Sequence, residues 1–164
     1  EEYLAMGLEC YFGLWAHDPN GDGFCGDQEY AFITREAMAI GDSALFAIIN
    51  GFFGEAWEYT AVLPQGFNSN FFMINQEGLD YTYRSQYLKN IETSGDQSIN
   101  FYGNDFSNQI SGTTGNNTFI GYGGDDILIG GSGVDRAIYH GDYNYYAILP
   151  PIVTLDSSFQ IIDL

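Results

Sequence analysis

Oxygen-bearing side chains recur at a fixed spacing in the second half of this chain. Asn108, Asn117, Asp126 and Asp135 follow one another at intervals of nine residues. Carboxylate and amide side chains, together with backbone carbonyls, are the oxygen ligands that calcium takes in proteins. The spacing therefore predicts calcium binding, provided that the fold brings members of this column close together.

A glycine and an apolar residue recur with the same period. Glycine lets the chain turn tightly, and the residues around each apolar position suit a short strand. The segment from Tyr102 to Ala137 thus contains four units, each a turn followed by a strand, and this pattern is typical of a solenoid. The glycine column is Gly103, Gly112, Gly121 and Gly130, and the apolar column is Ile110, Phe119, Leu128 and Ala137.

Two such units complete one coil, so the first and third are expected to stack on one sheet and the second and fourth on the other. This stacking places Asn108 opposite Asp126, and Asn117 opposite Asp135. The apolar column points between the sheets and forms only a thin core. We therefore expect oxygen cages between stacked turns, occupied by calcium, to hold the coils together.

The last two units, GYGGDDILIGGSGVDRAIY, resemble the G-G-x-G-x-D-x-U-x repeats of RTX (hemolysin-type) calcium-binding proteins. The resemblance implies a parallel β-roll, calcium as the bound ion and export by a bacterium. The first two units carry Asn in place of Asp and lack the paired glycine, so their share of each cage is expected to be weaker. An ordinary Gly- and Asn-rich loop is the alternative. The implied metal-binding positions are Asn108, Asn117, Gly121, Gly124, Asp126, Gly130, Gly133 and Asp135.

A second oxygen-rich pattern lies near the start of the chain. The segment from Asp18 to Glu29 fits the spacing D-x-[DN]-x-[DN]-G-x5-E, and it resembles an EF-hand loop. Side-chain oxygens, one carbonyl and a bidentate glutamate would surround one calcium ion, and Gly23 would make the sharp bend. The alternative is a polar turn between two helices that binds nothing. The expected ligands are Asp18, Asn20, Asp22, the carbonyl of Phe24 and Glu29.

The two cysteines, Cys10 and Cys25, belong to the first predicted helix and to this loop. In an exported protein two cysteines often form a disulfide, which here would join the loop to the preceding helix. Two buried thiols are the alternative.

The segment EYLAMGLECYFG at the start resembles the C-terminal part of secreted zinc metallopeptidases, in which a helix carries the third zinc ligand. Carried over to this chain, that ligand is Glu2, and zinc would be a cofactor of a parent protein. A solvated glutamate at a helix N-terminus is the alternative. Peptide hydrolysis by this route also needs H-E-x-x-H, whereas the chain contains only His17 and His140, far apart. Whether the parent protein is an enzyme stays open.

Composition limits the partners. The chain has 22 acidic and 4 basic residues, a net charge of −18, which disfavours nucleic acid and anionic membrane and favours divalent cations. No run of 18 apolar residues is present to span a bilayer. Because the chain opens at Glu1 without Met, we expect a processed form or a fragment.

The predicted fold class is α+β, with a small helical N-terminal part followed by a short parallel β-roll. Apolar spacing predicts a first helix, a second over residues 28–40 and a third that is capped by Asp42 or Ser43 and runs to Gly54. The aromatic residues that follow are expected in core packing or as a lid over the first coil, carbohydrate binding being the alternative. The expected divisions are 1–54 helical, 55–98 an aromatic-rich connector, 99–148 the roll, and 149–164 C-terminal strands.

The favoured hypothesis is a calcium-binding module of a secreted RTX-like protein that folds outside the cell as calcium rises. One alternative is the C-terminal fragment of a secreted zinc metallopeptidase. Another is a calcium-dependent subunit of a surface layer or fibre, in which partners would be copies of the chain itself. Other segments of the parent protein are the remaining expected partners.

Overall fold

The computed structural model describes residues 2–13, 30–54, 59–79, 81–140 and 158–163. Its contacts divide the chain into two compact units. The first comprises Glu1–Glu58 and Asn75–Tyr87, and the second comprises Tyr59–Ile74 and Leu88–Leu164. No helix among the described residues is long and apolar enough to cross a membrane.

The first unit is helical. Its elements are α1 (Glu2–Tyr11), α2 (Arg35–Gly41), α3 (Ser43–Phe53) and α4 (Thr82–Ser85). The second helix begins later than the sequence pattern predicts, because Thr34 caps it by accepting a hydrogen bond from the Ala37 backbone N–H. Asp42 caps α3, as predicted. The buried core is Cys10, Tyr11, Tyr30, Met38, Leu45 and Ile49.

The side chain of Arg35 packs against aromatic rings from other segments of this unit. The Arg35 guanidinium stacks on the rings of Tyr11 and Tyr87, 4.1 and 4.2 Å from their centroids, which joins α1, α2 and the segment after α4 through cation–π contacts. Cys10 is buried, but its expected disulfide partner Cys25 lies outside the described residues.

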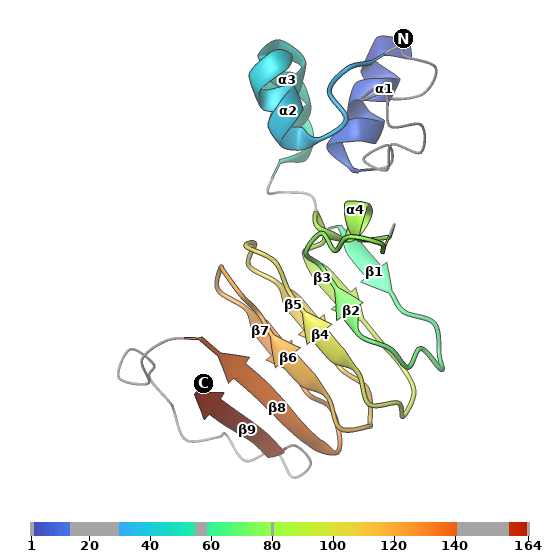
Figure 1. Cartoon of the computed structure of the whole chain (residues 1–164), viewed down its shortest axis with the longest axis vertical. Helices are drawn as coiled ribbons and strands as arrows, with labels where there is room; N and C mark the ends of the chain where they lie inside the picture. The colour runs from blue at the N-terminus through green and yellow to red at the C-terminus, as the bar shows by residue number, and fades with distance from the viewer. Residues whose placement is uncertain (1, 14–29, 55–58, 80, 141–157, 164) are drawn as a thin grey trace. The chain divides into compact units, whose positions relative to one another are not determined.

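The second unit is a parallel β-roll of two sheets (Figure 1). One sheet has the order β1-β3-β5-β7 and the other β2-β4-β6-β8-β9. Neighbouring strands in both sheets pair in parallel. Consecutive strands alternate between the two sheets from β1 to β8, whereas β9 joins the same sheet as β8. The strands are β1 (Thr60–Val62), β2 (Phe71–Phe72), β3 (Asn90–Glu92), β4 (Asn100–Tyr102), β5 (Gln109–Ser111), β6 (Thr118–Ile120), β7 (Ile127–Ile129), β8 (Val134–Tyr139) and β9 (Ser158–Asp163).

The register confirms two nine-residue units per coil. Ile110 lies beside Leu128 in one sheet, and Phe119 lies beside Ala137 in the other. Ile110, Phe119 and Ala137 are buried between the sheets and Leu128 is partly buried. The α+β class and the roll are therefore as predicted.

The roll also extends towards the N-terminus beyond the four units. Phe101 stacks on Phe119 with ring centroids 5.1 Å apart, so β4 continues the apolar column. Strands β1, β2 and β3 add further rungs from residues that the sequence assigns to a connector. Of the aromatic residues there, Phe71 and Tyr87 are buried, in keeping with core packing.

Candidate calcium sites in the turns of the roll

The turns of units two apart lie against each other through one column of residues. The backbone N–H of Asn108 donates to Asp126 Oδ1 at 2.9 Å, and that of Asn117 donates to Asp135 Oδ1 at 2.8 Å. The same bond runs from the Ile99 N–H to Asn117 Oδ1 at 3.3 Å. The structure therefore brings together the two pairs that the sequence period places opposite each other.

Each of the two carboxylates also folds over the first glycine of its own turn. A Cβ atom on Gly121 would lie 1.9 Å from Asp126 Oδ2, and one on Gly130 would lie 2.3 Å from Asp135 Oδ2. Any side chain at these glycines would therefore displace the carboxylate. Later glycines of the same turns, Gly124 and Gly133, have φ of +86° and +103°, which other residues rarely adopt.

Asp135 is a buried carboxylate with one unsatisfied oxygen. It has no exposed surface; its Oδ1 accepts hydrogen bonds from Asn117, whereas its Oδ2 has no partner. A buried charge without a counter-charge costs several kcal/mol, on the order of magnitude expected for removing an ion from water. A cation beside Oδ2 would offset this cost, so the residue fits a calcium ligand.

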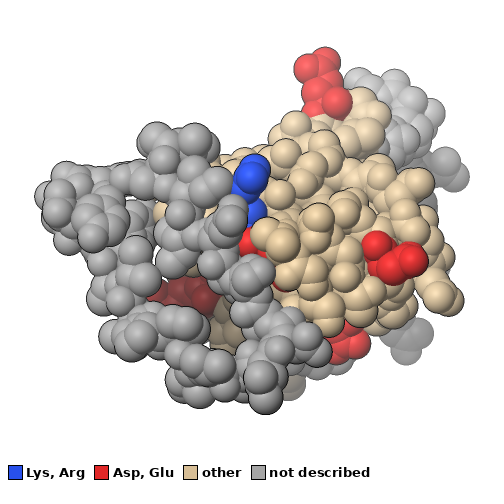
Figure 2. Space-filling model, turned by 90° about the horizontal axis from the view of Figure 1, so that it is seen from below, with Lys and Arg blue, Asp and Glu red and all other residues tan. Residues whose placement is uncertain are grey.

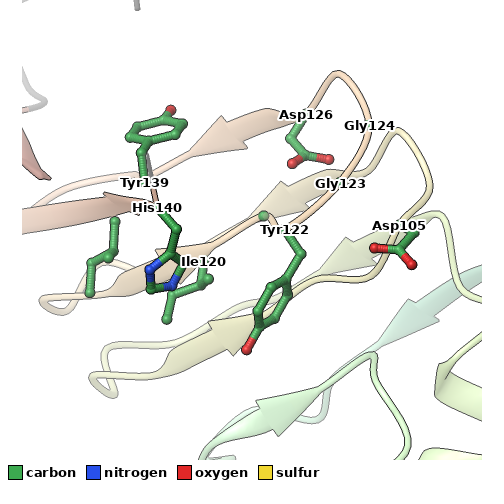
Figure 3. A pocket seen from close by; sticks show the side chains of 10 residues that line it. Asp105, Ile120, Tyr122, Gly123, Gly124, Asp126, Tyr139 and His140 are labelled. Atoms are coloured by element: carbon green, nitrogen blue, oxygen red, sulfur yellow. The ribbon is translucent and has the colours of Figure 1, made fainter. Parts of the chain in front are cut away.

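Asp126 lines a cavity of about 380 Å³ beside its own turn. The cavity is bounded by residues 120–124 and 138–140 and by the carboxylates of Asp105 and Asp126 (Figure 3). Burial raises the pKa of the Asp126 carboxyl; the hydrogen bond from the Asn108 N–H opposes this rise and the charge of Asp125 adds to it. Two carboxylates and nearby glycine carbonyls form an oxygen-rich setting suited to calcium.

Sequence reasoning missed Asp105 as a member of this site. A Cβ on Gly123 would lie 3.0 Å from Asp105 Oδ1, because the two residues are stacked 18 positions apart. The separation of 18 residues between Asp105 and Gly123 could have predicted this contact from the sequence. The repeat motif alone does not point to Asp105, because this residue stands at a position where the motif accepts any residue.

Tyr122 is the second residue of its turn, where unit four has Gly131. Its φ is +68°, the only positive value at a non-glycine residue in the described part of the chain. Its ring stacks on His140, with centroids 6.5 Å apart. His140, which directly follows β8, thus borders the Asp126 cavity.

The remaining predicted ligands have no described geometry. Asp18, Asn20, Asp22, Phe24 and Glu29 lie outside the described residues. Glu2 opens α1, but its side chain is outside what the structure describes. Within the described ranges, no three His, Cys, Asp or Glu side chains form a cluster that could hold a metal. Backbone carbonyls would have to complete any cage in the roll.

The charge of the surface agrees with cation binding. Acidic side chains stand at several separate places on the described surface in Figure 2, with little basic surface beside them. The whole chain carries a net charge of −18, so its field attracts divalent cations.

Comparison with known proteins identifies a repeat family in the second half of the chain. Residues 102–137 match the family model of the RTX calcium-binding nonapeptide repeat in four copies, so this segment is an array of RTX repeats. No curated protein and no solved structure matches the chain. The resemblance of the N-terminal segment to zinc metallopeptidases is therefore not shown.

Proposed function

We propose that this chain binds calcium at Asp126 and Asp135 and that binding folds the C-terminal turns of the roll after secretion. RTX repeats make the segment 102–137 a calcium-binding module, and such repeats are typical of secreted bacterial proteins. The observation that carries the proposal is the buried Asp135 carboxylate, whose Oδ2 has no hydrogen-bond partner.

The physical mechanism is linkage between binding and folding. Without calcium, the carboxylates of the turns repel one another and the thin core does not offset the chain entropy lost on folding. Each ion that binds only the folded turns stabilises them by RT ln(1 + [Ca]/Kd), about 2.7 kcal/mol when calcium is at 100 times its Kd. Calcium is scarce in the cytosol and abundant outside, so the roll would fold on the outer side.

The test compares two isosteric changes. Asp135→Asn removes the buried charge, and Asp96→Asn removes an exposed charge from an earlier turn of the roll. Calcium titrations followed by calorimetry and circular dichroism should show that Asp135→Asn loses one binding event, whereas Asp96→Asn binds as the parent does. Equal calcium binding by the parent and Asp135→Asn would refute the assignment.

Elemental analysis of the purified chain addresses the other predicted ions. The loop from Asp18 to Glu29 is proposed as a further calcium site, so calcium content should fall by one ion in Glu29→Gln. Zinc in stoichiometric amount would instead favour the peptidase relationship through Glu2, for which no described residue provides separate support.

A further inference from the structure

The two Asn residues of the repeat column make contacts that the two Asp residues do not. Asn108 is 2% exposed. Its Nδ2 donates to Asn104 Oδ1 at 2.9 Å and to the Leu88 carbonyl at 3.5 Å, and its Oδ1 accepts from the Asn104 N–H at 3.1 Å. Asn104 in turn donates to the same Leu88 carbonyl at 2.9 Å. Both amides are thus satisfied without an ion.

Asn117, which is 1% exposed, also has its side-chain amide satisfied by protein oxygens, and these are more numerous than around Asn108. Its Nδ2 lies 2.8 Å from the Gly115 carbonyl, 3.1 Å from Asp135 Oδ1, 3.3 Å from the Gly130 carbonyl and 3.4 Å from the Thr113 carbonyl. Four oxygens from two stacked turns therefore surround one amide nitrogen. A cluster of carbonyls and a carboxylate is the environment that calcium needs, and here an N–H donor stands inside it.

We propose that Asn108 and Asn117 replace calcium in the first two turns, so that the roll has a metal-independent N-terminal half and a calcium-dependent C-terminal half. An amide supplies donors to surrounding oxygens, whereas a carboxylate at the same position has only acceptors and requires a cation. The Asn108 and Asn117 side chains are then substitutes for ligands, and the ions bind at Asp126 and Asp135. This inference rests on the proposed calcium binding at those two residues.

The consequence concerns the order of folding. Strands β3 to β6 would form without calcium and present Asn108 and Asn117 to the turns that follow. The backbone N–H of each already reaches the carboxylate 18 residues later. The preformed half would act as a template, so calcium has to order only the last two turns and the loop-closure cost is smaller.

Hydrogen exchange of the full chain tests this with four equivalent amides. Each N–H belongs to the residue that follows the Asn or Asp of its repeat and donates to a carbonyl of the coil before it: Gln109 to Lys89, Thr118 to Ile99, Ile127 to Asn108 and Arg136 to Asn117. In metal-free buffer we expect Gln109 and Thr118 to exchange at least about tenfold more slowly than in an unstructured chain, as amides of stable segments do. Ile127 and Arg136 should gain such protection only after calcium is added.

Variants that replace Asn by Asp test whether the amide takes the place of calcium. Asn117→Asp places a carboxylate within the oxygen cluster, so Thr118 should lose its calcium-free protection and the calcium content should rise by one ion per chain. Asn108→Asp should do the same for Gln109. Asn68→Asp makes the same chemical change at an exposed position of the roll, outside the repeats. It should leave the calcium-free protection and the calcium content unchanged.

The outcomes distinguish this inference from the proposed function. Loss of protection at all four amides in metal-free buffer, restored by calcium, would overturn the inference and leave calcium-dependent folding intact. Protection that never responds to calcium would overturn the proposed function itself. The exchange pattern of the unmodified chain decides between these results whether or not the Asp variants fold.

Discussion

At the scale of single residues, the proposed calcium sites depend on glycines that leave room for carboxylates. Gly121 has no positive φ, so its conformation does not require glycine. The reason for glycine is the close approach of Asp126 Oδ2, which would lie 1.9 Å from an added Cβ.

Gly121→Ala should therefore weaken calcium binding by about tenfold or more, corresponding to about 1.4 kcal/mol. The added methyl group displaces the carboxylate without forcing the backbone. Calcium titration monitored by calorimetry measures the effect. Gly51→Ala is the control, because a Cβ at Gly51 would have no atom within 4 Å. A calcium midpoint that is unchanged in Gly121→Ala would contradict the placement of Asp126.

The raised pKa of Asp126 predicts opposite pH effects with and without calcium. In the metal-free folded state the carboxyl binds its proton more tightly than in the unfolded chain. Lowering the pH through the folded pKa should therefore increase the free energy of unfolding, an increase that is complete below the unfolded value near 4. With calcium present, protonation removes a ligand, so the calcium midpoint should rise over the same range.

Urea unfolding from pH 7 down to pH 4 checks both signs, in buffers freed of metal and in buffers with added calcium. Asp126→Asn is the reference, because an amide in this position cannot titrate. Its unfolding free energy should depend less on pH in metal-free buffer, and identical slopes for the two proteins would count against a raised pKa.

At the scale of the elements, strands of three residues are held by pairing with the coil before and the coil after. Phe101 and Phe119 stack between the sheets with an interplanar angle of 14°, and both are fully buried. This pair connects β4 with β6 within the apolar core of the roll.

Phe119→Ala should lower the free energy of unfolding by about 3–5 kcal/mol, the usual cost of removing a buried phenylalanine ring. Phe106, on an exposed part of a turn, provides the comparison, and Phe106→Ala should change the value by no more than about 0.5 kcal/mol. Urea titrations in saturating calcium measure both. Equal effects of the two substitutions would show that the apolar column does not form the core.

At the scale of the whole molecule, net charge and specific ligation make separate contributions. With a net charge of −18, self-repulsion destabilises every compact state, and salt screens it within about 10 Å at 0.1 M. In the proposed function calcium also occupies defined sites, which screening cannot reproduce.

Raising NaCl should therefore stabilise the metal-free chain without protecting the amides of Ile127 and Arg136, and calcium should protect them at any salt concentration. Magnesium is the matched divalent control, because it needs a small octahedral site and gives up its water reluctantly. Hydrogen exchange in the three salts measures the difference. Protection by magnesium equal to that by calcium would indicate that charge neutralisation alone folds the turns.

The period of nine residues sufficed to predict the roll, the two sheets and the pairs Asn108–Asp126 and Asn117–Asp135. The reason is that every such contact joins residues 18 positions apart, so a local pattern contains the long-range register. The first rungs could not be recognised in this way. Thr60 pairs with Asn90, and Phe71 with Phe101, at a separation of 30 residues because Asn75–Tyr87 belongs to the helical unit.

By itself, the sequence determined the repeat register, the alternation between sheets and the oxygen chemistry of the turns, because these follow from residue types at a constant spacing. Only the tertiary structure decided which of those oxygens lack a partner. Asp135 Oδ2 is unsatisfied, whereas the Asn117 amide is surrounded by acceptors from two turns. Burial and hydrogen-bond satisfaction depend on how distant segments fill the space around a side chain, and the repeat pattern of the sequence does not contain that information.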